Sequence, residues 1–384
     1  MNKKIIRFGV IGCGLMGKEF ASAIGRWCHL TDLDVEPRIV AACDANPAAI
    51  EWFTNNVPSI VRTYSDYKQL LADKEVDAVY CAVPHNLHEQ LYIDIISAGK
   101  HLLGEKPFGI DKSACQNIMS AIKSHPETVV RCSSEMPFYP GGYAIQKLVR
   151  EGRFGRIMEV ESGLWHSSDL NADKPINWKR QVAQCGEYGC LGDLGMHALH
   201  LPLRFGWKPT HVSASLLKVV QSRPDGKGGI QPCETWDNGT LQCRVRHADG
   251  YDFQMHVSTK RIAPGHNNTW FLRIYGTKMS AEYSTKNPKE LRVMPYENGG
   301  PQAWHVSDVG WESGYRGITG SIFEFGFSDV IQQMWAAFVD ELAHGRAGMK
   351  QPLYCATPEE AMAHHEIFTA ALESQKNAST VALR

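Results

Sequence analysis

The chain has 384 residues and a formal net charge of −1, and a chain of this length predicts two domains. Hydrophobic residues make up 43% and charged residues 21%, which is enough apolar material for a core in each domain. The balanced charge argues against a nucleic-acid or anionic-membrane partner, and no apolar run is long enough to span a bilayer. We therefore expect a small-molecule partner.

The eleven cysteines are odd in number and scattered, without a C-x-x-C pair. This usage is typical of a reducing compartment and not of a disulfide framework. Lys3 and Lys4 precede an apolar run that faintly resembles a secretory leader, but Arg7 interrupts it and no small-residue cleavage site follows. We predict a cytoplasmic protein.

Residues 1–133 alternate strand and helix signals. Apolar runs predict strands at 5–11, 38–43, 76–83, 101–103 and 129–132. Periodic segments predict helices at 15–27, 47–55, 65–71, 85–98 and 111–125. Strand and helix repeated with short links predict a parallel sheet with helices on both faces, an α/β domain.

Residues 134–384 have a different pattern. Alternating segments predict long antiparallel strands with one covered face at 157–164, 210–220, 240–247, 251–258 and 270–275. Helices are predicted at 144–151, 193–205, 328–344 and 358–374. The polar segment 221–234, rich in Gly and Pro, is interpreted as a mobile loop, and the whole as an α+β domain.

A glycine turn links the first strand to the first helix. Gly12 allows a tight turn, Gly14 lets the backbone approach a pyrophosphate, and Gly17 lets helix and strand pack closely. The helix begins at Leu15 and Met16, and its first N–H groups would bind the phosphates. A lone turn of this kind also occurs without a ligand, but the flanking strand and helix favour a dinucleotide.

Asp44 ends the second strand, where a carboxylate accepts hydrogen bonds from the ribose hydroxyls of NAD and repels the 2′-phosphate of NADP. It lies 27 residues after Gly17 (44 − 17), which is longer than usual, and the polar stretch 28–37 explains the difference as an elongated loop. No arginine follows Asp44 directly. The sequence predicts NAD as the cofactor, with NADP disfavoured.

Three residues predict redox chemistry. Lys106 follows the strand at 101–103, at the sheet edge where a nicotinamide would sit, and its charge can favour alkoxide character on a substrate oxygen. Asp193 and His197 are four apart on a predicted helix, so they share a face. Histidine titrates near neutrality and suits a general base, which the carboxylate would orient. Singly, each has a structural alternative: a solvated lysine, a helix cap and a core histidine.

Two further sets of residues are candidates for binding. Asp193, His197 and His200 on one helical face are a possible zinc set, but no cysteine or third-segment ligand accompanies them, and we expect no metal.

Indole faces beside polar groups are typical of sugar sites, although core aromatics are equally compatible with the sequence. The predicted substrate contacts are Trp165, His166, Trp178 and Lys179.

The chain resembles the glucose–fructose oxidoreductase / inositol dehydrogenase (Gfo/Idh/MocA) family over nearly its whole length. The resemblance rests on the glycine turn and on three later motifs, Pro84-His85-Asn86-Leu87-His88, Gly104-Glu105-Lys106-Pro107 and Gly192-Asp193-Leu194-Gly195-Met196-His197. It departs from the family's usual pattern at 137–140 and at 185–190, near the expected substrate cavity.

This resemblance implies a Rossmann domain in residues 1–133 and, in residues 134–384, an α+β domain with an open, mainly antiparallel sheet. The outer face of that sheet would build a homodimer or homotetramer. Lys106, Asp193 and His197 would line the reacting centre between the domains. The cofactor contacts implied by the two middle motifs are Pro84, His85, His88, Glu105 and Lys106.

The leading hypothesis is NAD-dependent oxidation of a secondary hydroxyl of a sugar, glycoside or cyclitol, or reduction of the ketone. His197 would be the base and Lys106 would polarise the oxygen. Asp193 would orient His197 and tune its basicity. An alternative is an NAD-dependent glycosidase that oxidises transiently, eliminates, adds water and reduces again with no net redox change. A third hypothesis is a non-catalytic NAD-sensing protein, which the intact set of three residues disfavours.

Overall fold

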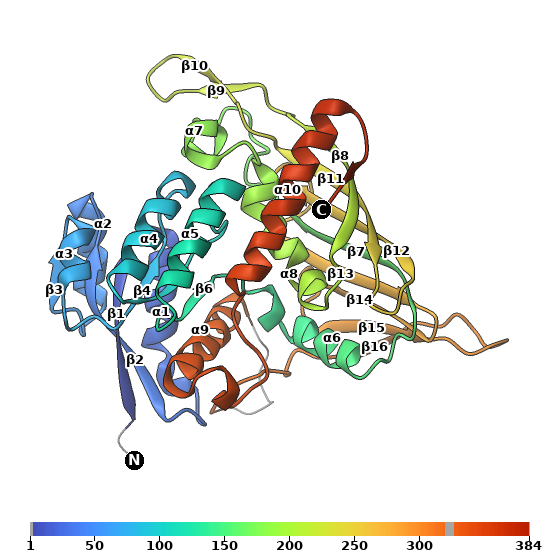
Figure 1. The fold of residues 1–384 in the computed structure, drawn as a ribbon, viewed down its shortest axis with the longest axis horizontal. Coiled ribbons are helices and arrows are strands. Elements are labelled where there is room, and N and C mark those ends of the chain that lie inside the picture. The colour runs from blue at the N-terminus through green and yellow to red at the C-terminus, as the bar shows by residue number, and fades with distance from the viewer. Residues whose placement is uncertain (1–2, 319–325, 384) are drawn as a thin grey trace. The chain divides into compact units, whose positions relative to one another are not determined.

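The computed structural model describes residues 3–318 and 326–383. The chain forms two compact units (Figure 1). The first unit consists of Met1–Gly109, Ser113–Phe138 and Ser313–Pro358, and the second of Ile110–Lys112, Tyr139–Glu312 and Glu359–Arg384. The boundary expected from the sequence, between residues 133 and 134, lies near the crossing from Phe138 to Tyr139, but it does not include the exchange of Ile110–Lys112 or the return of Ser313–Pro358 to the first unit.

The first unit contains a six-stranded sheet in the order β3-β2-β1-β4-β5-β6. All neighbouring strands run parallel, as predicted. The strands are β1 (Lys4–Ile11), β2 (Val35–Cys43), β3 (Arg62–Tyr64), β4 (Ala78–Cys81), β5 (His101–Gly104) and β6 (Val130–Cys132). The sequence did not predict β3, because its three residues form no apolar run.

Helices connect these strands, and their starts follow local capping chemistry. The Asn46 side chain accepts a hydrogen bond from the backbone N–H of Ala48, and Asp66 caps the next helix in the same way. The helices are α1 (Leu15–Gly25), η1 (Trp27–His29), α2 (Pro47–Asn56), α3 (Tyr67–Ala72), η2 (His85–Leu87), α4 (His88–Ser97), α5 (Lys112–Ser124) and η3 (Met136–Phe138).

One helix from late in the chain, α9 (Phe327–His344), packs on the first sheet and is followed by η6 (Arg346–Gly348). The Trp335 ring centroid lies 3.7 Å from that of Phe20, 5.0 Å from that of Tyr80 and 5.7 Å from that of Phe8. The predicted helix at 328–344 exists, but this aromatic cluster assigns it to the first unit. Its amphipathic pattern alone did not identify which sheet it covers.

The second unit contains a nine-stranded sheet in the order β16-β15-β14-β13-β7-β12-β11-β8-β17. Every neighbouring pair is antiparallel except β7 with β12, so the sheet is mainly antiparallel, as expected. Its strands are β7 (Ile157–Trp165), β8 (Pro209–Leu217), β11 (Asn238–Arg246), β12 (Asp252–Lys260), β13 (Thr269–Gly276), β14 (Met279–Ser284), β15 (Glu290–Pro295), β16 (His305–Asp308) and β17 (Val381–Ala382).

Helices cover one face of this sheet (Figure 1). Ser162 on β7 donates a hydrogen bond to the Ala198 carbonyl, and the Gln375 side chain accepts one from the Leu216 backbone, 2.8 Å away. The helices of this unit are α6 (Pro140–Arg150), η4 (Trp178–Arg180), α7 (Val182–Cys185), η5 (Leu191–Gly195), α8 (Met196–Arg204) and α10 (Pro358–Asn377).

The segment 221–234 is not a structureless loop. It forms a two-stranded antiparallel hairpin from β9 (Ser222–Pro224) and β10 (Ile230–Pro232). The guanidinium of Arg223 at its base is buried and donates to the backbone carbonyls of Asn171 and Asp169. The prediction of a loop was wrong here because Gly and Pro mark a turn equally well.

Candidate active site

The glycine turn has the shape that a dinucleotide requires. A Cβ atom on Gly12 would lie 2.2 Å from the Ala82 carbonyl oxygen, and one on Gly17 would lie 2.3 Å from the Gly12 carbonyl oxygen. Around Gly14, by contrast, a Cβ would meet nothing within 4 Å. Packing therefore demands the first and third glycines, while the second borders open space of the kind that a pyrophosphate needs.

Asp44 lies beside this turn. Its carboxylate accepts hydrogen bonds from the backbone N–H groups of Cys13 and Asn46, each 2.8 Å long. Leu15 is 75% exposed, Met16 is half-buried, and Gly14 has no side chain to cap α1. The N–H groups at this helix end are thus positioned for phosphate oxygens. The residues fit NAD.

His88 joins two of the predicted cofactor motifs. Its ring is fully buried, with Nδ1 2.7 Å from the Pro107 carbonyl oxygen and Nε2 2.9 Å from the Val83 carbonyl oxygen. Burial lowers the pKa of His88 to about 4, so the ring is neutral and donates to one of the two carbonyls. His88 therefore lies between the loop of Lys106 and the segment that follows β4. A direct contact of His88 with the cofactor stays a prediction, and so do those of Pro84 and the buried His85.

Glu105 anchors the backbone from which Lys106 projects. The Tyr80 hydroxyl donates to its buried carboxylate over 2.7 Å, and the Tyr92 hydroxyl donates to its carbonyl over 2.7 Å. Burial raises the pKa of Glu105, while the charge of the half-buried Lys106 acts in the opposite direction. The Lys106–Pro107 peptide bond is cis. Glu105 thus has a structural role, and its predicted contact with the cofactor remains untested.

Asp193 lies in the π-helix η5, directly before α8, rather than at the start of an ordinary α-helix. Its carboxylate is 2% exposed and binds two cations: Lys179 Nζ is 3.0 and 3.1 Å from its two oxygens, and Arg261 Nη2 is 2.9 Å from Oδ2. Single π-turns recur at functional sites. Asp193 therefore binds two positive side chains. Its role in orienting His197 stays a prediction.

His197 and His200 are both buried on α8. His200 Nε2 lies 2.7 Å from Arg204 Nη2 and 3.5 Å from the Glu360 carboxylate, and burial followed by the Arg204 charge lowers the pKa of His200 to about 4. His200 thus belongs to a structural ion-pair network. Within residues 3–318 and 326–383, no group of three His, Cys, Asp or Glu side chains could hold a metal ion.

The backbone of Lys179 is fixed by its neighbours. The Asn177 side chain accepts a hydrogen bond from the Lys179 N–H over 3.0 Å, and Thr235 donates to its carbonyl over 2.8 Å. The amine lies 5.6 Å from the Trp178 ring centroid. Two predicted substrate residues are therefore presented together, with the Lys179 amine directed to Asp193.

These side chains border a pocket of about 370 Å³ within the second unit. It is lined by His166, Ser168, Asp169, Lys174, Asn177, Trp178, Lys179, Asp193 and Arg261. Trp165 is outside this lining; its indole N–H donates to Ser258 Oγ over 3.0 Å, and Lys260 Nζ lies 4.5 Å from its ring centroid. Three of the four predicted substrate residues thus share a pocket with Asp193.

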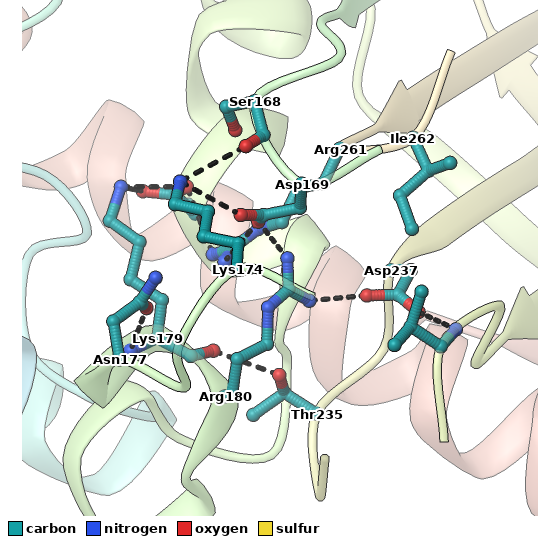
Figure 2. A network of polar contacts seen from close by, with 12 residues as sticks. Ser168, Asp169, Lys174, Asn177, Lys179, Arg180, Thr235, Asp237, Arg261 and Ile262 are labelled. Atoms are coloured by element: carbon teal, nitrogen blue, oxygen red, sulfur yellow. Dashed lines mark hydrogen bonds and ion pairs between the residues drawn. The ribbon is translucent and has the colours of Figure 1, made fainter. Parts of the chain in front are cut away.

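Ion pairs connect residues of the pocket lining to buried residues behind it (Figure 2). Arg180 is fully buried and pairs with both Asp169 and Asp237, and Lys174 Nζ lies 3.4 Å from Asp169. No sequence motif pointed to Asp169, Lys174 or Arg261. The alternating pattern of β12 could have identified Arg261. Every second residue from Phe253 to Thr259 is buried, and Arg261 is the next buried position in this alternation.

Lys106 belongs to the first unit, whereas Asp193 and His197 belong to the second. The glycine turn with Asp44, and the anchored loop of Lys106, lie at the carboxyl ends of parallel strands, where open α/β sheets bind nucleotides. The polar pocket with Asp193 suits a small hydroxylated molecule. These features define a two-domain, nucleotide-dependent class of protein, and the meeting of the three predicted catalytic residues stays a prediction.

Comparisons with known proteins give the family. A family model described as "Oxidoreductase family, NAD-binding Rossmann fold" matches residues 6–131, and the GFO/IDH/MocA C-terminal domain matches residues 143–282. The chain belongs to the Gfo/Idh/MocA family of oxidoreductases.

Named relatives act on sugars and cyclitols. Levoglucosan dehydrogenase of Pseudarthrobacter phenanthrenivorans is 24% identical over 75% of this chain and 76% of its own. Inositol 2-dehydrogenase of Rhizobium meliloti is 29% identical over 75% of this chain and 78% of its own. A solved levoglucosan dehydrogenase in complex with NADH and L-sorbose has the same fold, with a TM-score of 0.86 at 22% identity over 99% of each chain. In the described part of the chain, no helix has the length and apolar character to cross a bilayer.

Proposed function

We propose that this oxidoreductase oxidises a secondary hydroxyl of a sugar, glycoside or cyclitol with NAD, or reduces the corresponding ketone. The observation that carries the proposal is the pocket in which Trp178 and Lys179 accompany Asp193, in a chain that also has Lys106 and His197. The named relatives, a levoglucosan dehydrogenase and an inositol 2-dehydrogenase, support this substrate class.

NAD would be held by the glycine turn, from Gly12 to Gly17, and by Asp44, and when bound it supplies the hydride acceptor. His197 takes the hydroxyl proton from the substrate. Lys106 donates a hydrogen bond to the same oxygen and stabilises its alkoxide character. Asp193 orients His197 and keeps Lys179 in the pocket wall.

Three finer properties belong to the same proposal. The carboxylate of Asp44 favours NAD over NADP, because a 2′-phosphate would meet a like charge. Eleven thiols, ten of them buried, suit a reducing cytoplasm. The alternately exposed positions of β11 leave a sheet face on which two or four copies of the chain would associate.

The first test is to mix the protein with NAD and a panel of pyranosides, cyclitols and amino sugars while following nicotinamide absorbance. We expect NADH with at least one class and none with the Lys106→Ala variant. Aglycone release without net NADH would instead favour the redox-neutral glycosidase. No reaction across the panel, with either readout, would overturn the proposal.

A further inference from the structure

The pocket of the second unit has an excess of positive charge. Two lysines and three arginines are set in and directly behind its wall, against three aspartates. The cations are Lys174, Lys179, Arg180, Arg223 and Arg261, and the carboxylates are Asp169, Asp193 and Asp237. Among the described residues of this cluster, the five cations outnumber the three carboxylates by two.

Arg261 has two donor nitrogens that make no hydrogen bond to the described residues. Its guanidinium is 0% exposed and lines the pocket, and Nη2 binds Asp193. Nη1 and Nε have no hydrogen-bond partner among the described residues. The carboxylate paired with Nη1, that of Asp169, lies 4.0 Å away and is already bound by Arg180 and Lys174. A buried donor without an acceptor costs free energy, which a ligand oxygen would recover.

Lys174 provides a second donor at the pocket rim. Its amine donates to the Ser168 carbonyl over 3.0 Å and to Asp169 over 3.4 Å, which uses two of its three N–H groups. The side chain is 43% exposed, so the remaining N–H group can meet a ligand from solvent. Lys174 and Arg261 both line the pocket, and both lie within 4.0 Å of the Asp169 carboxylate.

We propose that this pocket binds the carboxylate of an acidic monosaccharide, such as a uronate or a sugar acid. The inference rests on the proposed function and names its substrate class. A carboxylate accepts two N–H donors and neutralises one of the excess charges, whereas a hydroxyl leaves both charges uncompensated. A volume of about 370 Å³ is near the lower end for small-molecule sites and suits one sugar ring beside the Trp178 indole.

The test is calorimetric binding of matched pairs that differ in one carboxylate: glucuronate against glucose, galacturonate against galactose, and gluconate against glucitol. Saturating NADH is present, because it cannot accept hydride and turnover is blocked. We expect the acid of at least one pair to bind ten-fold or more tightly than its neutral partner, and the difference to shrink at high salt. Equal affinities in all three pairs would overturn the inference, and tighter binding of the sugar 6-phosphates than of the uronates would overturn the choice of carboxylate.

Variants locate the site. Lys174→Ala should reduce the acid preference at least five-fold, whereas Lys208→Ala, which removes an exposed lysine paired with Glu366 outside the pocket, should leave the acid preference unchanged. Arg261→Lys keeps the charge but removes the guanidinium fork, and should also reduce the preference. An acid preference that survives in both Lys174→Ala and Arg261→Lys would contradict the assignment.

The two proposals fail in different ways. Tight binding of an acid with no NADH formed from any sugar or sugar acid would contradict the dehydrogenase and retain the carboxylate site. NADH formation from neutral sugars without any preference for acids would contradict the carboxylate site and retain the dehydrogenase.

Discussion

The backbone on either side of Lys106 is held in place by hydrogen bonds of its neighbours. Glu105 is bound through its carboxylate by Tyr80 and through its carbonyl by Tyr92, and His88 lies against the Pro107 carbonyl. We therefore expect Lys106→Ala to keep the fold but lower kcat about 100- to 10,000-fold. Steady-state kinetics measure this, with the exposed Lys123→Ala as control. A kcat within a few-fold of the original would contradict the role of Lys106.

Asp44 has two separable properties, its charge and its acceptor oxygens. Asp44→Asn keeps an oxygen for the Cys13 N–H but removes the negative charge. The affinity ratio of NADP to NAD should then rise about ten-fold, because a like-charge contact is lost. Titration with both cofactors measures the ratio, and Glu51→Gln, which makes the same charge change at an exposed position of α2, is the matched control. An unchanged ratio would show that Asp44 does not face the ribose.

At the scale of elements, buried ion pairs connect η4 to the loop after β7, through Asp169, and to the residue that precedes β11, Asp237. Arg180 is completely buried with Asp169 and Asp237. Arg180→Met would leave two buried carboxylates short of a partner, and we expect a loss of about 3–5 kcal/mol of stability. Urea denaturation followed by tryptophan fluorescence measures this loss. Arg246→Ala, which breaks an exposed arginine–aspartate pair in the same unit, should leave the midpoint nearly unchanged, and equal effects of the two variants would refute the argument.

Helix α9 carries a pH-dependent contact at its C-terminal end. Burial opposes the charged form of His344, but hydrogen bonds to the carboxylates of Asp340 (2.7 Å) and Asp34 (3.3 Å) raise its pKa above the ordinary value. A raised pKa stabilises the folded state below the unfolded pKa, and this stabilisation is lost as pH rises through the folded pKa.

We therefore expect His344→Gln to destabilise the protein by about 1 kcal/mol at about pH 5.5 and by much less at about pH 9. Denaturation midpoints at the two pH values test this, with the exposed His305→Gln as control. A difference that grows with pH would contradict the assignment.

At the scale of the whole molecule, local patterns predicted the elements better than their partners. The parallel sheet and the glycine turn followed from apolar runs and from one short motif. The pattern of α9 gave a helix but not its attachment to the first unit, because amphipathicity shows that a face is buried and not what buries it. Strands β14 to β16 were not predicted, although Met279, Ala281 and Tyr283 of β14 alternate with polar residues as in the strands that were.

The candidate site was predictable where a motif fixes chemistry by spacing. Asp193 and Lys179 were both identified, but not their contact, because they lie fourteen residues apart on different elements. Arg261 and Asp169 became candidates only when the fold brought them together. Ion-pair partners distant in sequence depend on strand register and loop path, which a single sequence does not reveal.

The most direct test of the account is a crystal structure with NADH and a bound sugar or sugar acid. We predict that Lys106 Nζ and an imidazole nitrogen of His197 both lie about 3 Å from the substrate oxygen whose carbon faces the nicotinamide C4. A structure in which the amine of Lys106 and the ring of His197 lie in separate regions, or in which neither meets the reacting oxygen, would contradict the account.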